Sequence, residues 1–414
     1  MMAAVRKNID EPFMSVERSG KPLCVFLLLI NILNTVFLPY DTFHLKAASL
    51  IMLLLVGVRC WFVAEAERTI LVYSLAVTSL TIVLSILQTG DIAGNIKGGY
   101  MGMILLLLPI IKYYRINFEK MLMNTIILMS YCLIVLALLD YLDILRISKN
   151  PLLLWYFNTG NGKFAHYDSS VTSYRLYLKT SPMICLAMPY CLKKKRFISF
   201  VGVFVAMFIS GTRANQIVGI FSVGCSLALV RDKSVTKTIR CLIMLVIMSV
   251  ILAEGSLIEY FKEYFTDKVW SDDVREATKS VILQGWKENP LNFFIGTGYT
   301  SAIFDPTRKE MMPIVENSYW NLLRQIGLLP FIMMMGMYLY PIVKLVLEKR
   351  EWAYASVYVG YLAICYNDPL LYSTTGMMVL LYMYYLCFSP LAKVPQTDFP
   401  DSGKHIETGG SVSV

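Results

Sequence analysis

Long apolar runs separated by short charged segments make up most of the chain. Each run has about 17–25 residues, enough for a helix to cross a hydrocarbon core of about 30 Å. The pattern predicts an all-α polytopic membrane protein with about twelve transmembrane helices. The predicted spans are residues 22–38, 43–63, 69–88, 98–114, 120–142, 176–192, 197–212, 214–230, 238–256, 318–343, 353–367 and 370–388.

The charged segments predict how these spans are threaded. Lys and Arg are concentrated in short loops such as 193–196, 231–240 and 344–350. If both termini lie inside, the inside loops hold the excess of positive charge, as expected for cytoplasmic loops. Residues 1–394 then form one transmembrane domain with two large periplasmic loops, about 144–175 and 257–317. The polar tail 395–414 is predicted to be disordered.

Composition agrees with a membrane location. The chain is 56% hydrophobic and 16% charged, and its mean hydropathy is +0.56. The net charge of +9 could attract nucleic acid, but its distribution fits membrane orientation instead, so no nucleic-acid partner is expected. The nine cysteines lie in or beside apolar runs without CxxC spacing. They are interpreted as small core residues, and no metal site is predicted.

An arginine interrupts the long apolar stretch 197–230. Basic clusters flank both ends of this stretch, so it must cross twice and turn near Arg213. Each arm is only about 24–26 Å long as a helix, which places Arg213 at or just below the outer surface, facing a polar cavity. A charge at that depth is costly and is often functional. The alternative is an arginine that reaches lipid headgroups.

A second arginine lies in the outer segment before the tenth span. Residues 272–288 have the pattern of an amphipathic helix lying on the membrane or on the bundle, with Asp272 and Asp273 as candidate caps and 288–290 as its end. One face would hold the apolar and small residues Val274, Ala277, Thr278, Val281, Ile282 and Gly285. Arg275 stands in the first turn. Periodicity alone would make it a solvated surface charge.

Two short motifs follow this helix. Gly296 and Gly298, just before Tyr299, predict a tight turn or a close backbone approach to a ligand. Glu316 is predicted to begin the tenth span and to share a helix face with Arg324, about 12 Å away. A carboxylate there could be an end group favoured by the helix dipole, or a general base.

In this order, the motifs resemble the bacterial O-antigen polymerase (Wzy) and O-antigen ligase superfamily. The matching stretches are 210–214, Arg275 ahead of Trp286 and 296–298, and 316–319 leading into 322–328. Motif detail covers about 197–345, and the remainder resembles the family only in span number and in the large outer loop. The resemblance implies a fold like that of the membrane-embedded GT-C glycosyltransferases.

The family transfers sugar chains from undecaprenyl diphosphate at the periplasmic face of the inner membrane. The resemblance implies that Arg213 and Arg275 hold the diphosphate and that Glu316 is the base, without a cofactor or metal. Where this chain has Glu316, the ligase branch has histidine, which favours a polymerase of lipopolysaccharide biosynthesis. The further substrate-binding residues implied are Arg175, Gly296, Gly298, Tyr299, Asn317, Tyr319 and Arg324. A chain-length regulator and a flippase are the expected protein partners.

Other functions remain open at this point. A flippase or transporter of lipid-linked oligosaccharide would also have about twelve spans, but it predicts charges near the bilayer midplane and two similar halves. An O-antigen ligase and a cell-wall glycan polymerase belong to the same class of reaction. A purely structural membrane protein is hard to reconcile with Arg213 and Glu316.

Overall fold

The computed structural model describes residues 2–39, 44–63, 68–166, 174–230, 269–307, 309–315 and 317–389. This part of the chain is almost entirely helical. The α-helices are α1 (Met2–Phe37), α2 (Leu45–Val63), α3 (Arg68–Thr89), α4 (Ile92–Gly99), α5 (Leu107–Tyr113), α6 (Phe118–Tyr141), α7 (Pro151–Tyr156), α8 (Ala187–Lys193), α9 (Phe197–Ile209), α10 (Arg213–Leu229), α13 (Val269–Glu288), α14 (Leu291–Ile295), α15 (Ser318–Ile326), α16 (Leu328–Leu347), α17 (Trp352–Ile364) and α18 (Thr374–Phe388).

Short helices and two hairpins complete the fold. The short helices are η1 (Tyr100–Leu106), η2 (Ile147–Lys149), η3 (Phe157–Asn161) and η5 (Ser181–Leu186). Strand β1 (Gly162–His166) pairs antiparallel with β2 (Tyr174–Leu178), and β3 (Ile303–Asp305) pairs antiparallel with β4 (Glu310–Met312).

Five helical segments within the described ranges are long and apolar enough to cross a membrane. They are Gly20–Phe37, Arg68–Thr89, Ile92–Tyr113, Phe118–Tyr141 and Leu328–Leu347. Further apolar helices of 10–17 residues accompany them. The protein is therefore all-helical, and its long apolar helices are those of a multi-pass membrane protein.

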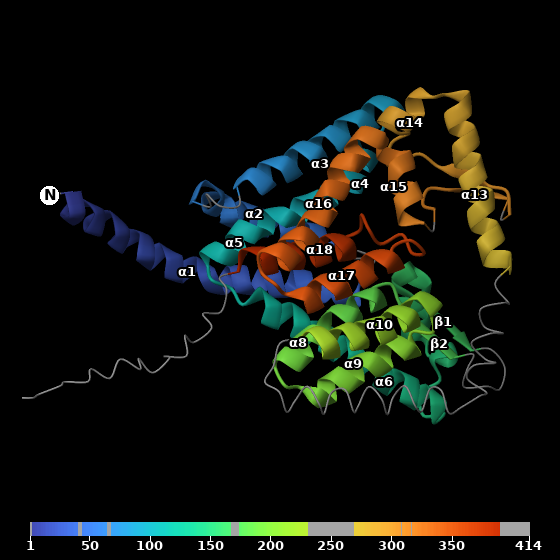
Figure 1. The fold of residues 1–414 in the computed structure, drawn as a ribbon, viewed down its shortest axis with the longest axis horizontal. Helices are drawn as coiled ribbons and strands as arrows, with labels where there is room; N and C mark the ends of the chain where they lie inside the picture. The colour runs from blue at the N-terminus through green and yellow to red at the C-terminus, as the bar shows by residue number, and fades with distance from the viewer. Residues whose placement is uncertain are drawn as a thin grey trace, which may run out of the picture.

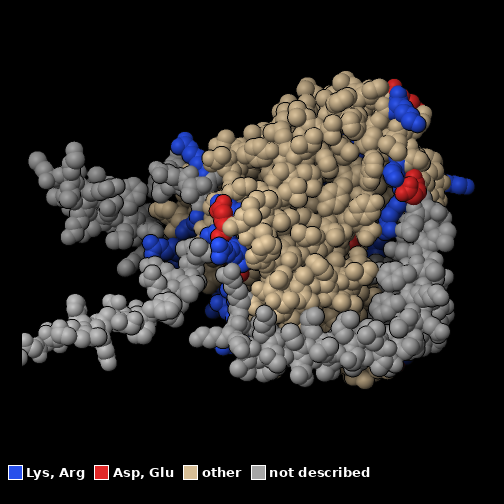
Figure 2. All heavy atoms as spheres, viewed as in Figure 1, with Lys and Arg blue, Asp and Glu red and all other residues tan. Residues whose placement is uncertain are grey.

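The surface of the molecule is also that expected of a membrane protein. The long helices run roughly along the longest axis of the molecule, and α13 stands across one end of them (Figure 1). On the face in Figure 2, Lys, Arg, Asp and Glu gather at the two ends and leave an uncharged surface between them. Large apolar side chains are exposed along the helices, among them Leu87 at 74% and Ile198 at 83%. An uncharged belt with charged ends is the surface that a bilayer requires.

The helices pack around α18. All but three of its fifteen residues are buried, and tyrosines on it and on its neighbours fill the core. Tyr382 of α18 and Tyr354 of α17 both donate hydrogen bonds to Oε1 of Glu119 on α6, at 3.2 and 3.0 Å. These bonds tie three helices together at one end of the bundle.

Two of the predicted spans are wrong in their form. Within the predicted sixth span 176–192, residues 176–178 belong to β2, and helix begins only at Ser181. Pro182 in the first turn suits a helix start, because proline has no N–H to donate. The predicted tenth span 318–343 is broken at Gly327, whose φ of +80° and ψ of 172° end α15 and begin α16.

Part of the first of the two predicted large loops has regular structure. The Asn and Gly residues within 158–162 suggest a flexible centre of this loop, but residues 157–161 form a turn of π-helix and Gly162 begins β1. Gly160 has a φ of +85° within this turn, a conformation that glycine adopts without strain.

Candidate functional site

Helix α13 forms the outer layer of the candidate site. Val274, Thr278 and Ile282 are buried, four residues apart, so the predicted apolar face is confirmed. The helix ends at Glu288 as predicted. Its predicted start is wrong: α13 already begins at Val269, so Asp272 and Asp273 lie within its first turns and do not cap it.

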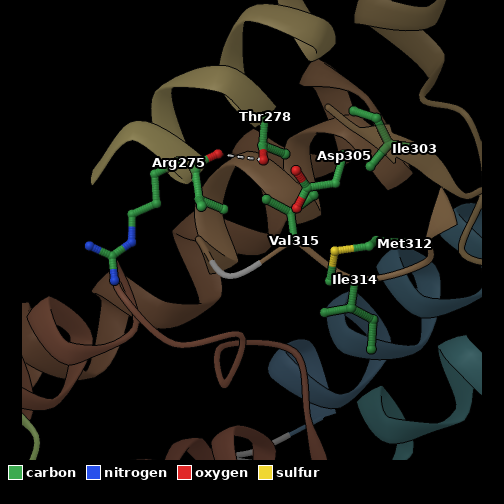
Figure 3. A pocket seen from close by; sticks show the side chains of 8 residues that line it. Arg275, Thr278, Ile303, Asp305, Met312, Ile314 and Val315 are labelled. Carbon is green, nitrogen blue, oxygen red and sulfur yellow. Dashed lines mark hydrogen bonds between the residues drawn. The ribbon is translucent and has the colours of Figure 1, made fainter. Parts of the chain in front are cut away.

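A small pocket lies between α13 and the β3–β4 hairpin (Figure 3). Its lining residues are Val274, Arg275, Thr278, Ile303, Asp305, Met312, Ile314 and Val315. The pocket volume is about 10 Å³, roughly the space that one water molecule needs. Any ligand larger than water therefore requires the hairpin and α13 to separate.

The polar groups of this pocket are held by local hydrogen bonds. Thr278 Oγ1 donates to the carbonyl oxygen of Val274 at 2.7 Å. Asp305 is 1% exposed, and its Oδ1 accepts from the backbone N–H of Thr307 at 2.9 Å, which stabilises the hairpin turn. In Figure 3 the stem of Arg275 starts beside the pocket, and its guanidinium points away from Asp305.

Arg324 on α15 is buried beneath the same outer segment. It is 4% exposed, and its Nη1 donates to the carbonyl and hydroxyl oxygens of Ser301, at 3.0 and 2.7 Å. Its Nη2 donates to Pro313 O at 3.1 Å and to Asn321 Oδ1 at 3.2 Å. Each of these acceptors is uncharged. Helix α15 lies outside the five candidate spans, and burial lowers the pKa of this guanidinium from 12.5 to about 10.

A chain of amide side chains continues from Arg324 to α4. Asn321 Nδ2 donates to Gln325 Oε1, and Gln325 Nε2 donates to the carbonyl oxygen of Tyr299. The N–H of Tyr299 in turn donates to Oδ1 of Asn95, which is 0% exposed. The hairpin segment, α15, the glycine turn and α4 are thus one connected network.

The glycine turn itself is confirmed. Gly296 and Gly298 have φ values of +83° and +89°, which favour glycine. A Cβ on Gly296 would lie 2.3 Å from Gln325 O, so the close approach in this structure is to the protein's own backbone. Backbone N–H groups of Thr297 and Gly298 donate to the carbonyls of Arg324 and Gln325. These bonds cover the last carbonyls of α15 where it breaks before α16.

Two predicted substrate-binding residues have structural contacts. Asn317 is the N-cap of α15, and its Oδ1 accepts from the N–H groups of Tyr319 and Trp320. Tyr319 Oη donates to Leu362 O of α17 at 2.8 Å. Since Asn317 is extended, the helix face predicted to run from Glu316 to Arg324 starts only at Ser318. Glu316 itself lies outside the described residues.

For the other two predicted arginines, the structure gives the backbone position. Arg213 is the first residue of α10, after a turn in which Gly211 has a φ of +62°. The predicted turn between two short apolar helices is therefore confirmed. Arg175 lies in β2 opposite Ala165 of β1. Whether either arginine reaches the pocket near Arg275 stays a prediction.

One buried lysine was not among the residues predicted from the sequence. Lys46 on α2 is 2% exposed, and its Nζ donates to Pro39 O at 2.6 Å and to Thr374 Oγ1 at 3.2 Å. It joins α2 to the first turn of α18. A lysine at the start of the apolar run 43–63 was the available signal, because an ionisable group inside a membrane protein is often functional.

Comparison with known proteins adds no relative. No protein-family model matches the chain, and a search of curated proteins finds no match.

Proposed function

We propose that the chain is an O-antigen polymerase of the bacterial inner membrane. It has about twelve spans in a GT-C-like fold, both termini in the cytoplasm and its site at the periplasmic face. Its reaction joins oligosaccharide repeat units carried on undecaprenyl diphosphate. The order of the sequence motifs supports membership of this family, and the geometry around residues 301–315 supports the location of the site.

One observation carries the proposal. Arg275 of α13 and Arg324 of α15 both adjoin the segment 301–315, at an end of the helical bundle where α13 lies across it. The same segment leads directly to Asn317 and the start of α15. Positive side chains from two helices beside one segment suit an anionic substrate.

The chemistry follows from the leaving group. An acceptor hydroxyl oxygen attacks the anomeric carbon of the donor, and the bond from that carbon to the diphosphate oxygen breaks. Glu316 takes the hydroxyl proton as general base. Arg213 and Arg275 neutralise the departing undecaprenyl diphosphate through charge-assisted hydrogen bonds, which stabilise charge as it develops.

The test is a lipopolysaccharide ladder on a gel, from a polymerase-null strain carrying the wild type or a single variant. Arg213→Ala, Arg275→Ala and Glu316→Ala should each leave cores capped by a single repeat, with the ladder lost. Lys287→Ala is the matched control for Arg275, because Lys287 is an exposed cation in the last turn of the same helix. Protein levels in membranes must match.

Three other results would redirect or remove the proposal. Cores without any repeat, together with long chains accumulating on the lipid carrier, would indicate a ligase. Loss of lipid-linked repeats from the periplasmic face would indicate a flippase. Normal ladders in all three variants would remove these residues from the mechanism.

A further inference from the structure

Three lysines gather around the C-terminal end of α18. The Nζ atoms of Lys344 and Lys112 lie 4.3 and 5.3 Å from the centre of the Phe388 ring. The Nζ of Lys349 donates to the carbonyl oxygen of Ser389 at 2.7 Å. The three residues come from α16, from α5 and from the turn after α16, so the fold brings them together from separate parts of the chain.

This lysine cluster (Lys112, Lys344 and Lys349) concentrates positive charge. Lys344 and Lys349 are both close enough to repel the charge on Lys112. Glu348 Oε2 lies 3.5 Å from Lys344 Nζ, but the Glu348 side chain is 64% exposed, so solvent weakens its effect. The C-terminal ends of α16 and α18 offset the remainder only by partial charges. An anion between the lysines would relieve their mutual repulsion.

An apolar stripe begins beside the cluster. Leu339, Val343 and Leu347 are 49%, 54% and 71% exposed and follow one another at four-residue spacing, so they form one outward face of α16. Tyr340 stands next to this face, and its Oη accepts a hydrogen bond from Lys344 Nζ at 3.1 Å. Tyrosine between an apolar surface and a charged group is typical of the membrane interface.

Cations and an apolar face together match an amphiphile. We propose that the lysine cluster binds the phosphate of an anionic phospholipid, whose acyl chains lie along Leu339, Val343 and Leu347 of α16. A free phosphate shares the headgroup chemistry but makes no use of the apolar face. Helix α5, which carries Lys112, lies toward the end of the bundle opposite α13 (Figure 1), so this site is separate from the candidate site and does not depend on the proposed function.

The experiment is native mass spectrometry of the purified full chain with added phosphatidylglycerol or phosphatidylcholine. The wild type should retain phosphatidylglycerol in preference to phosphatidylcholine. The triple variant Lys112→Gln, Lys344→Gln, Lys349→Gln should bind phosphatidylglycerol at least about tenfold more weakly, since each lysine near a headgroup contributes to the attraction. The triple Lys→Arg variant keeps the charges and should retain most of the binding.

A matched control removes the same charge elsewhere. Lys97, Lys120 and Lys287 are exposed lysines on other helices, and their triple Gln variant should bind phosphatidylglycerol like the wild type. Equal losses in both triple variants would mean non-specific attraction and overturn the proposal. Unchanged binding in the first triple variant would also overturn it. Displacement of the lipid by millimolar inorganic phosphate would reassign the cluster to free phosphate.

Discussion

Arg324 Nη1 binds both oxygen atoms that Ser301 offers, the carbonyl at 3.0 Å and the hydroxyl at 2.7 Å. Its Nη2 binds Pro313 O. Ser301 precedes β3 and Pro313 follows β4, so one guanidinium fastens both ends of the hairpin. Because the hairpin forms one wall of the pocket beside Arg275, Arg324 sets the position of that wall.

Replacing Arg324 should therefore release the hairpin. In Arg324→Met the two ends lose their shared partner, while an apolar side chain of similar length fills the buried space. The substitution removes a buried charge but leaves the acceptors on Ser301 and Pro313 with one partner fewer, so we expect the unfolding temperature in detergent to fall by a few degrees while the protein stays folded. Arg324→Lys should not hold both ends of the hairpin either, because a single ammonium group cannot reproduce the planar, two-pronged hydrogen bonding of a guanidinium.

Spin labels can report the hairpin directly. Ser280 on α13 and Met311 on β4 are exposed, and labelled cysteines there give the distance between the two walls. Cys132, Cys225 and Cys241 would be replaced by serine to avoid background labelling. The electron–electron distance distribution should broaden in both Arg324 variants and stay narrow in Lys287→Met. A distribution unchanged by Arg324→Met would show that the hairpin holds its place without this arginine.

Two glycines, Gly296 and Gly327, should not tolerate a side chain. A Cβ on Gly296 would lie 2.3 Å from Gln325 O, and one on Gly327 would lie 2.3 Å from Phe294 O. Both residues also have positive φ. Gly296→Ala and Gly327→Ala should each destabilise the fold by roughly 3 kcal/mol or more, measured as loss of the folded fraction on fluorescence-detected size exclusion after heating.

Gly285 is the matched control for these substitutions. It lies within α13, and nothing stands within 4 Å of a Cβ placed on it. Gly285→Ala should be neutral or should stabilise α13 by about 0.5–1 kcal/mol, because alanine loses less chain entropy in a helix. Equal heat sensitivity in all three alanine variants would mean that the turn tolerates a side chain.

Local patterns predicted the local features correctly. The buried face of α13 follows from residues three and four apart, and the turn before Arg213 follows from basic clusters at both ends of one apolar stretch. Gly296 and Gly298 predicted a turn because only glycine enters such conformations freely. In each case the information lies in the same stretch of sequence as the feature.

The failures involve distant partners. Apolar residues continue on both sides of Gly327, so the apolar pattern runs through the break; in the fold, backbone atoms of Phe294 and Gly296 leave no room for a Cβ at this position. Likewise, the short apolar run at 176–178 is compatible with either a helix or a strand, and its pairing with β1 makes it a strand. Two of the residues that bind Arg324, Pro313 and Ser301, lie 11 and 23 residues away, beyond the reach of any helical period.

Asn95 is fully buried, and its side chain connects three parts of the chain. Its Nδ2 donates to Ser85 O, Thr89 Oγ1 and Asp91 O, and its Oδ1 accepts from the N–H of Tyr299. Asn95→Ala leaves these groups without that partner in the interior. The free energy of unfolding should fall by about 2–3 kcal/mol, measured by thermal unfolding in detergent.

Gln284→Ala is the control. Gln284 is exposed and bonds only to Glu288 among the described residues, so this substitution should change the free energy of unfolding by no more than about 0.5 kcal/mol.

Asn95→Asp separates the hydrogen bonds from the burial of charge. The new side chain keeps an acceptor for Tyr299 but loses the amide donor, and because its charged form is costly to bury at 0% exposure, it should stay protonated in the folded protein. The folded state then holds a proton that the unfolded state releases, so stability should fall as pH rises from 5 to 8. Relative to the wild type, the variant should recover as the pH is lowered. A pH-independent difference between the two proteins would show that water reaches Asn95 and that the α4 junction is open.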